Sequence, residues 1–295
     1  MSSETSESTL DALCRRAPLQ MCRLVGAEGI APECRLRPLA EAPVYFADPA
    51  SCVLGVLGVL VCFERAHAVA RRGYAAVRAR LEYTVFFFAM ACWYAFSALA
   101  RSFYAAPSAA ATWFVLGDAW AGASAALTLA LAGAAETGRV GTVTHLRTRT
   151  RALILAAVHA LHAAVYVACG AAHRGYAFLR VFWAVVLAGG VAVYAVLLIL
   201  RVVRAPALRL VVLVAAVAAA LVAAALAMFA FGTALCARLS PYFGGAHVAT
   251  LLLTAALWAF YYVYGRLKTG EIRHLKEVRL DDGSVARVAH VERVK

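Results

Sequence analysis

Residues 210–237 read LVVLVAAVAAALVAAALAMFAFGTALCA, a run of 28 residues without one Asp, Glu, Lys or Arg. A helix that crosses a bilayer needs about 20 consecutive apolar residues, because the hydrocarbon core is about 30 Å thick. Lipid offers the backbone no hydrogen bonds, and a helix satisfies its own backbone within one segment. The stretch therefore predicts a transmembrane helix.

The composition extends this interpretation to the whole chain. Of its 295 residues, 64% are hydrophobic and 15% are charged, against roughly 25% charged in a soluble domain, which argues strongly against a water-soluble globular fold. Six further apolar segments lack the alternating polar positions of a barrel strand. We predict an all-α fold, a polytopic membrane protein with a bundle of seven transmembrane helices. The other six spans are Pro49–Phe63, the shortest, then Tyr83–Ala100, Ala109–Ala135, Ala152–Ala172, Val181–Leu200 and Gly245–Gly265.

Basic residues are distributed unequally between the two sides of the predicted bundle. The loops 64–82, 136–151 and 201–209 and the tail after Gly265 hold five, four, three and eight Lys or Arg, which is 20 of the 29 in the chain. The positive-inside rule places this side in the cytosol. We thus expect a lumenal head (1–46) without a cleavable signal peptide, a membrane domain (47–265) and a cytosolic tail (266–295). Because topology explains the basic excess, no nucleic-acid partner is expected.

The cysteines gather near the predicted lumenal face. Cys14, Cys22 and Cys34 lie in the head, and Cys236 lies near the lumenal end of the sixth span. The head spacing does not match a zinc-ribbon pattern, and an oxidising compartment favours disulfides, so no metal or other cofactor is expected. A head with an odd number of cysteines needs an outside partner, for which Cys236 is a candidate. Free, buried cysteines that pack as small apolar residues are the alternative.

The head also carries a sequence motif. Residues 10–22 read LDALCRRAPLQMC and residues 29–34 read GIAPEC. This order of residues resembles the head of the fungal chitin synthase export chaperone family, which precedes seven membrane helices. The motif residues are Cys14, Pro18, Leu19, Cys22, Gly29, Ile30 and Cys34.

Two weaker similarities to the same family lie near the last span, in the stretch from Cys236 to Gly245 and in the aromatic run Tyr261–Tyr264. The family usually continues with a Trp-Asp pair and an acidic segment, whereas this chain reads Gly265-Arg266-Leu267-Lys268 and then a net-basic tail.

The resemblance implies a function that is not enzymatic. It implies an endoplasmic reticulum membrane chaperone that a polytopic chitin synthase requires for export, in support of cell-wall chitin synthesis. Small residues such as Gly189-Gly190 and the Ala-rich stretch 215–227 could let its helices cover polar or poorly packed faces of this client. The alternative is that Ala merely fills helical positions. Self-association is left open.

Three polar residues inside the spans suggest chemical alternatives. Asp118 is the acidic residue well inside a span, and an intramembrane carboxylate is a functional hypothesis by default. His159 and His162 are three residues apart and share a helix face. They could indicate a ceramidase-like intramembrane hydrolase, although such a zinc site needs a third ligand, and hydrogen bonding within the bundle is the preferred interpretation. A seven-helix receptor or transporter is the other alternative.

The tail after Gly265 alternates basic and acidic residues. It could bind anionic lipid headgroups, but the alternation favours a plain solvated segment. Residues 278–288, around Asp281-Asp282-Gly283, predict a small hairpin.

Overall fold

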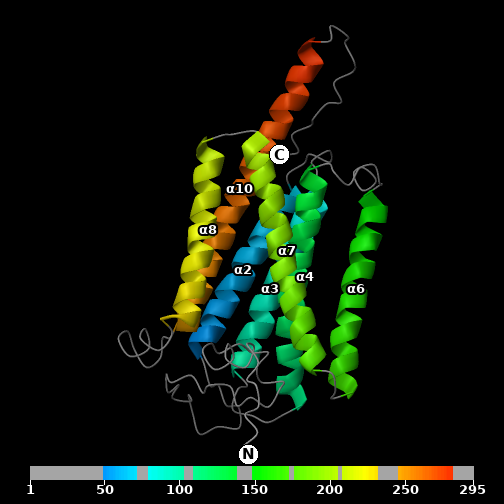
Figure 1. The fold of residues 1–295 in the computed structure, drawn as a ribbon, viewed down its shortest axis with the longest axis vertical. Helices are drawn as coiled ribbons and strands as arrows, with labels where there is room; N and C mark the ends of the chain where they lie inside the picture. Colours follow the sequence, from blue (N-terminus) through cyan, green and yellow to red (C-terminus); the bar gives the residue numbers. More distant parts are fainter. Residues whose placement is uncertain are drawn as a thin grey trace, which may run out of the picture.

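The computed structural model describes residues 49–71, 79–102, 109–137, 148–172, 176–204, 208–231 and 245–281. All regular structure in these ranges is helical, and seven helices are long and apolar enough to cross a membrane. Figure 1 shows them side by side as one bundle. The predicted all-α, seven-span fold is confirmed. The helices are α2 (Pro49–Arg71), α3 (Arg80–Ser102), α4 (Ala109–Thr137), α6 (Thr148–Ala172), α7 (Tyr176–Arg204), α8 (Leu208–Phe229) and α10 (Gly245–Asp281).

The first spanning helix ends later in the sequence than predicted, at Arg71 instead of Phe63. Helix α2 continues to Arg71, through the charged pair Glu64-Arg65, where the sequence predicts the start of a loop. The guanidinium of Arg65 lies over the rings of Trp258 and Tyr261 on α10, at 4.8 and 4.6 Å from their centroids. A cation held against aromatic faces is attracted to their π electrons, so the helix accommodates this charge without ending.

Two other helix ends, those of α8 and α10, differ from the predictions by more than five residues. Helix α8 ends at Phe229 and is followed by a turn at Ala230, so the span predicted to reach Ala237 is too long; residues 232–237 lie outside the described residues. Helix α10 continues past Gly265 to Asp281 and projects beyond the other helices (Figure 1). The hairpin predicted at 278–288 is wrong in its first part, because residues 278–281 are helical; its remainder lies outside the described residues.

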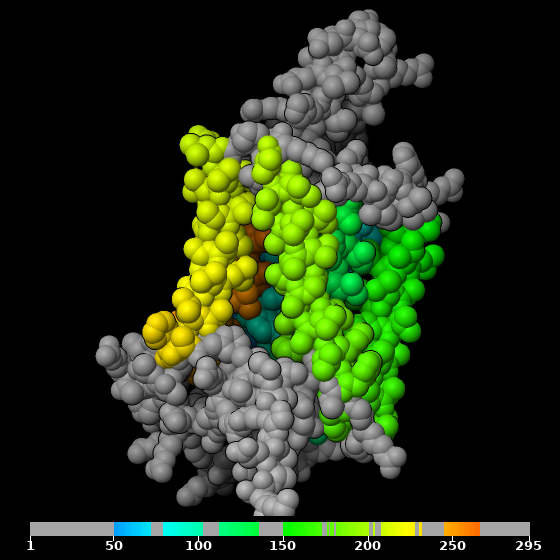
Figure 2. Space-filling model, viewed as in Figure 1, coloured from blue at the N-terminus to red at the C-terminus, as the bar shows by residue number. Residues whose placement is uncertain are grey.

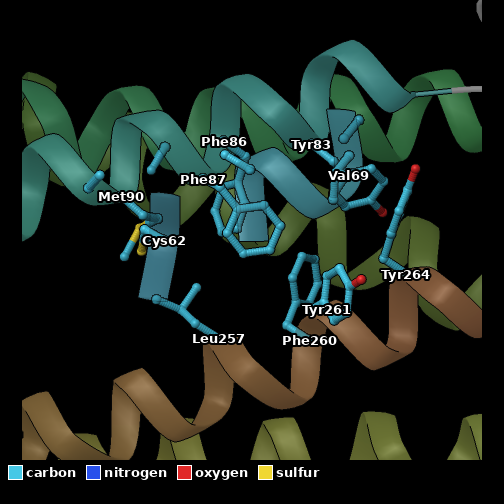
Figure 3. Packing of buried hydrophobic residues seen from close by; sticks show 14 of the residues in the cluster. Cys62, Val69, Tyr83, Phe86, Phe87, Met90, Leu257, Phe260, Tyr261 and Tyr264 are labelled. Carbon is cyan, nitrogen blue, oxygen red and sulfur yellow. The ribbon is translucent and has the colours of Figure 1, made fainter. Parts of the chain in front are cut away.

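An aromatic core joins α3 to α10. Figure 3 shows Phe86 and Phe87 of α3 pointing toward Phe260 and Tyr261 of α10. The ring centroids of Phe86 and Phe260 are 5.6 Å apart, in the edge-to-face arrangement that aromatic quadrupoles favour. Tyr83 of α3 also connects this core to α7, because its hydroxyl lies 3.0 Å from the hydroxyl of Tyr194.

The seven helices are packed unequally. In α2, α3, α4 and α10, between 33% and 50% of the residues of the spanning window are buried, against 17% in α6, 6% in α7 and 17% in α8. Helix α7 packs along α4 and helix α8 along α10. The bundle therefore consists of four inner helices and three peripheral ones, and α6 stands at its edge (Figure 1).

Candidate functional site

The head motif lies outside the described residues, as does the candidate disulfide partner Cys236. The motif residues (Cys14, Pro18, Leu19, Cys22, Gly29, Ile30, Cys34) and the disulfides proposed among their cysteines stay predictions. Within the described ranges, Cys52, Cys62, Cys92 and Cys169 are free thiols.

Asp118 belongs to a polar network at the end of the bundle where α2 begins. Its carboxylate lies close to the Ser97 hydroxyl and within electrostatic reach of the Arg101 guanidinium, whereas its Oδ1 is buried without a hydrogen-bond partner among the described residues. Arg101 in turn donates to Ser51 Oγ over 3.3 Å, and Ser51 Oγ lies 3.3 Å from His247 Nε2. These contacts link α4, α3, α2 and α10. In lipid, where an unpaired charge is costly, this arrangement suits a structural clamp.

A thiol contact lies at the same end of the bundle. Cys52 Sγ of α2 is 2.7 Å from Ser102 Oγ of α3, and Ser102 donates to the carbonyl of Ala98 over 2.7 Å. The first residues of α2 are thus bonded to the last turn of α3 through side chains.

His159 and His162 both point from α6 toward α4. His159 Nε2 lies 2.9 Å from Thr128 Oγ1, and His162 Nδ1 lies 3.0 Å from Ser124 Oγ. Both histidines thus bond to hydroxyl groups of the neighbouring helix. Across the described ranges, no group of three or more His, Cys, Asp and Glu side chains comes together in a way that could hold a metal ion.

An ion pair between α3 and α6 was not anticipated from the sequence. Arg151 donates to Glu82 Oε1 through Nε, over 3.1 Å, and through a terminal nitrogen. The side chains are 15% and 3% exposed, respectively. The pair lies where both helices begin, at the end of the bundle opposite the Asp118 network. The sequence gives no sign that Arg151 pairs with Glu82, because Glu82 is 69 residues away on a helix that is not consecutive with that of Arg151. Arg151 is counted there only among the basic residues of the predicted cytosolic side.

Glycines bring neighbouring helices into close contact at several points. A Cβ built on Gly190 of α7 would lie 2.6 Å from the carbonyl oxygen of Ala126 on α4, whereas one built on Gly189 would meet nothing within 4 Å. On α2, a Cβ at Gly55 would lie 2.5 Å from the Cβ of Ala98. One glycine of the predicted small-residue pair therefore serves packing within the bundle, and the other faces outward.

The outer surface of α7 and α8 is apolar and divided by a hollow. Figure 2 shows residues of α10 in brown-orange at the bottom of a hollow between α8 and α7. Large apolar side chains are exposed on both helices, among them Val185 and Val196 of α7 and Val222 of α8. Small ones are exposed as well, including Ala215 and Ala219 of α8. This mixture is suited to contact with lipid or with another membrane helix.

Comparison with known proteins identifies the family. The sequence model of the chitin synthase export chaperone family matches residues 7–271, a range that includes the head motif and all seven spanning windows. No match is found among curated proteins or among solved structures. The match covers most of the chain, and the resemblance inferred from the head is confirmed: this multi-pass membrane protein belongs to the chitin synthase export chaperone family.

Proposed function

We propose that this chitin synthase export chaperone works in the endoplasmic reticulum membrane, without catalysis, by binding its polytopic client through the peripheral helices α6, α7 and α8. The family supplies the role in export and the kind of client. The uneven packing of the bundle carries the proposed contact surface, because it leaves α7 with only 6% of its spanning window buried.

The physical reason for such a surface lies in the client. A multispan enzyme exposes polar or loosely packed helix faces before its own helices assemble, and lipid cannot satisfy them. A chaperone helix with small side chains allows close backbone approach, which gives van der Waals contact and interhelical hydrogen bonds. Ala215 and Ala219 are exposed and four residues apart, so both lie on one outward face of α8.

The orientation that we propose follows from the charges. The head faces the lumen and the tail the cytosol, because the loops on the tail side carry most of the Lys and Arg. The lumenal compartment is also where disulfides among the head cysteines would form.

The contact surface is tested by paired variants on α8. The double variant Ala215→Leu/Ala219→Leu adds bulk where we propose close approach, and Val212→Leu/Val222→Leu changes little on the same exposed helix. The amount of chitin synthase that co-purifies with the tagged chaperone is measured for each. The alanine pair should lose the client and the valine pair should retain it. Equal retention in both would place the client contact elsewhere.

A further inference from the structure

Two polar stripes face each other between α4 and α6. On α4, Ser124 and Thr128 are four residues apart; on α6, His159 and His162 are three apart, so each pair shares a helix face. Thr128 Oγ1 bonds His159 Nε2, and Ser124 Oγ bonds His162 Nδ1. Since the later residue of α4 meets the earlier residue of α6, the helices are antiparallel and these contacts form two successive rungs.

The next residues along both stripes are Trp120 and Tyr166. They are one turn further on their helices and pack in the same cluster of buried residues. In contrast with the first two rungs, neither Trp120 Nε1 nor Tyr166 Oη has a hydrogen-bond partner among the described residues, although both atoms are buried. The Tyr166 side chain is 2% exposed.

The histidines of the first two rungs have unused nitrogen atoms as well. Thr128 donates its single hydroxyl hydrogen to the carbonyl of Ser124, so toward His159 it accepts, and Nε2 carries the proton. In the neutral ring Nδ1 is then a bare acceptor. Within the described ranges, His159 Nδ1 and His162 Nε2 have no partner. The interface, which we call the α4–α6 seam, therefore offers unused donors and acceptors together.

The depth and the charge of the seam limit what it can bind. His162 lies near the middle of the span Thr150–Ala172, about 18 Å from its first residue and about 15 Å from its last at 1.5 Å per residue, whereas lipid headgroups lie outside the hydrocarbon core. The four side chains with unused atoms include neither an acid nor a Lys or Arg that would neutralise an ion. Buried polar groups in native proteins are nearly always hydrogen-bonded, so a small uncharged group fits the seam best.

We propose that the α4–α6 seam is a mid-membrane binding site for an uncharged group that both donates and accepts hydrogen bonds, a hydroxyl or a carboxamide. Water supplies this chemistry in the protein alone. A polar side chain of a transmembrane helix of the client supplies it in the complex, once α6 has moved far enough from α4 to expose the buried Tyr166 hydroxyl. The second source rests on the proposed function. In both cases the group that binds the seam is neutral, and it binds within the hydrocarbon core.

The water source is tested by X-ray hydroxyl-radical footprinting of the full chain in lipid nanodiscs. Radicals that arise from ordered water modify the adjacent side chains. Tyr166 should be modified, whereas Tyr83, which is equally buried but bonded to Tyr194, should not. Modification of Tyr166 with none at Tyr83 supports bound water in the seam.

The client source is tested by two Tyr→Phe variants. Tyr166→Phe removes a hydroxyl that has no bond within the described bundle, so it should fold normally. If a client side chain bonds there, the chitin synthase that co-purifies per folded chaperone should fall about two- to tenfold, the value of one hydrogen bond. In the control Tyr94→Phe, the lost bond is the internal one to Thr254, and the client ratio should not change.

The combined outcomes decide the proposal. An unmodified Tyr166 together with an unchanged client ratio in Tyr166→Phe would overturn it. A modified Tyr166 in a chaperone that binds no chitin synthase at all would support the binding site in the α4–α6 seam and contradict the proposed function. Failure of the proposed site and failure of the proposed function are therefore distinguishable.

Discussion

A single methyl group added at Gly190 or at Gly189 should have opposite effects on stability. The Cβ of Gly190→Ala would lie 2.6 Å from the carbonyl oxygen and 2.7 Å from the carbonyl carbon of Ala126, while that of Gly189→Ala would lie in open space. The obstacle is backbone, which cannot rotate away. To restore ordinary contact at about 3.4 Å, α4 and α7 must separate by about 0.8 Å, which forfeits a quarter to half of each contact energy along the interface.

The magnitude follows from the comparison of the two variants. Overpacking a filled interface costs about 1–3 kcal/mol. Both variants replace Gly by Ala in a helix and share the backbone effect, about 0.5–1 kcal/mol in favour of Ala in soluble helices, so that term cancels between them. We expect Gly190→Ala to be less stable than Gly189→Ala by about 1–3 kcal/mol.

The assay is unfolding of the purified chains in mixed micelles with increasing SDS, followed by loss of helical circular dichroism. Gly189→Ala should unfold at or above the wild-type SDS fraction and Gly190→Ala clearly below it. Equal midpoints for the two variants would refute the inferred close packing of α7 on α4.

Three further predictions concern an ion pair, a hydrogen bond and the topology. Glu82→Ala leaves the Arg151 charge without its partner and should lower the unfolding free energy by about 1–3 kcal/mol, less than for a fully buried pair because Arg151 is partly exposed. The exchange Glu82→Arg/Arg151→Glu should restore part of the lost unfolding free energy, and no recovery would contradict the pairing. Thr128→Val removes the bond to His159 and should cost about 0.5–1.5 kcal/mol, measured in the same SDS titration; an unchanged midpoint would count against that bond. The chain contains no Asn, so an engineered Asn-X-Thr sequon reports topology without background: one in residues 1–46 should be glycosylated and one after residue 281 should not, and the reverse pattern would overturn the orientation.

The existence and type of every spanning helix were predictable from the sequence, because apolar runs of this length have one stable form in lipid. The helix ends were less predictable. Arg65 interrupts the apolar run, yet α2 continues because Trp258 and Tyr261, nearly 200 residues away, shield the charge. Helix α8 shows the opposite difference, because it ends at Phe229 although the apolar run continues past that residue. The apolar pattern alone does not predict where this helix ends.

The polar contacts within the bundle could be predicted only in part. The spacing of His159 and His162 indicated a shared face, but their partners Ser124 and Thr128 are ordinary hydroxyl residues of an apolar helix and gave no signal. Glu82 and Arg151 belong to helices that are not consecutive, so their contact depends on the arrangement of the bundle. The head motif behaved differently, because its residue order was specific enough to indicate the family that the match over residues 7–271 then showed.

If the chain serves the export of a chitin synthase, the fraction of that enzyme at the cell surface depends on the chain. In a strain that lacks the chaperone, a fluorescently tagged chitin synthase should stay in the endoplasmic reticulum and cell-wall chitin should fall, and the wild-type chain should restore both. A tagged chitin synthase that reaches the surface in normal amount without the chaperone would contradict a role of the chain in its export.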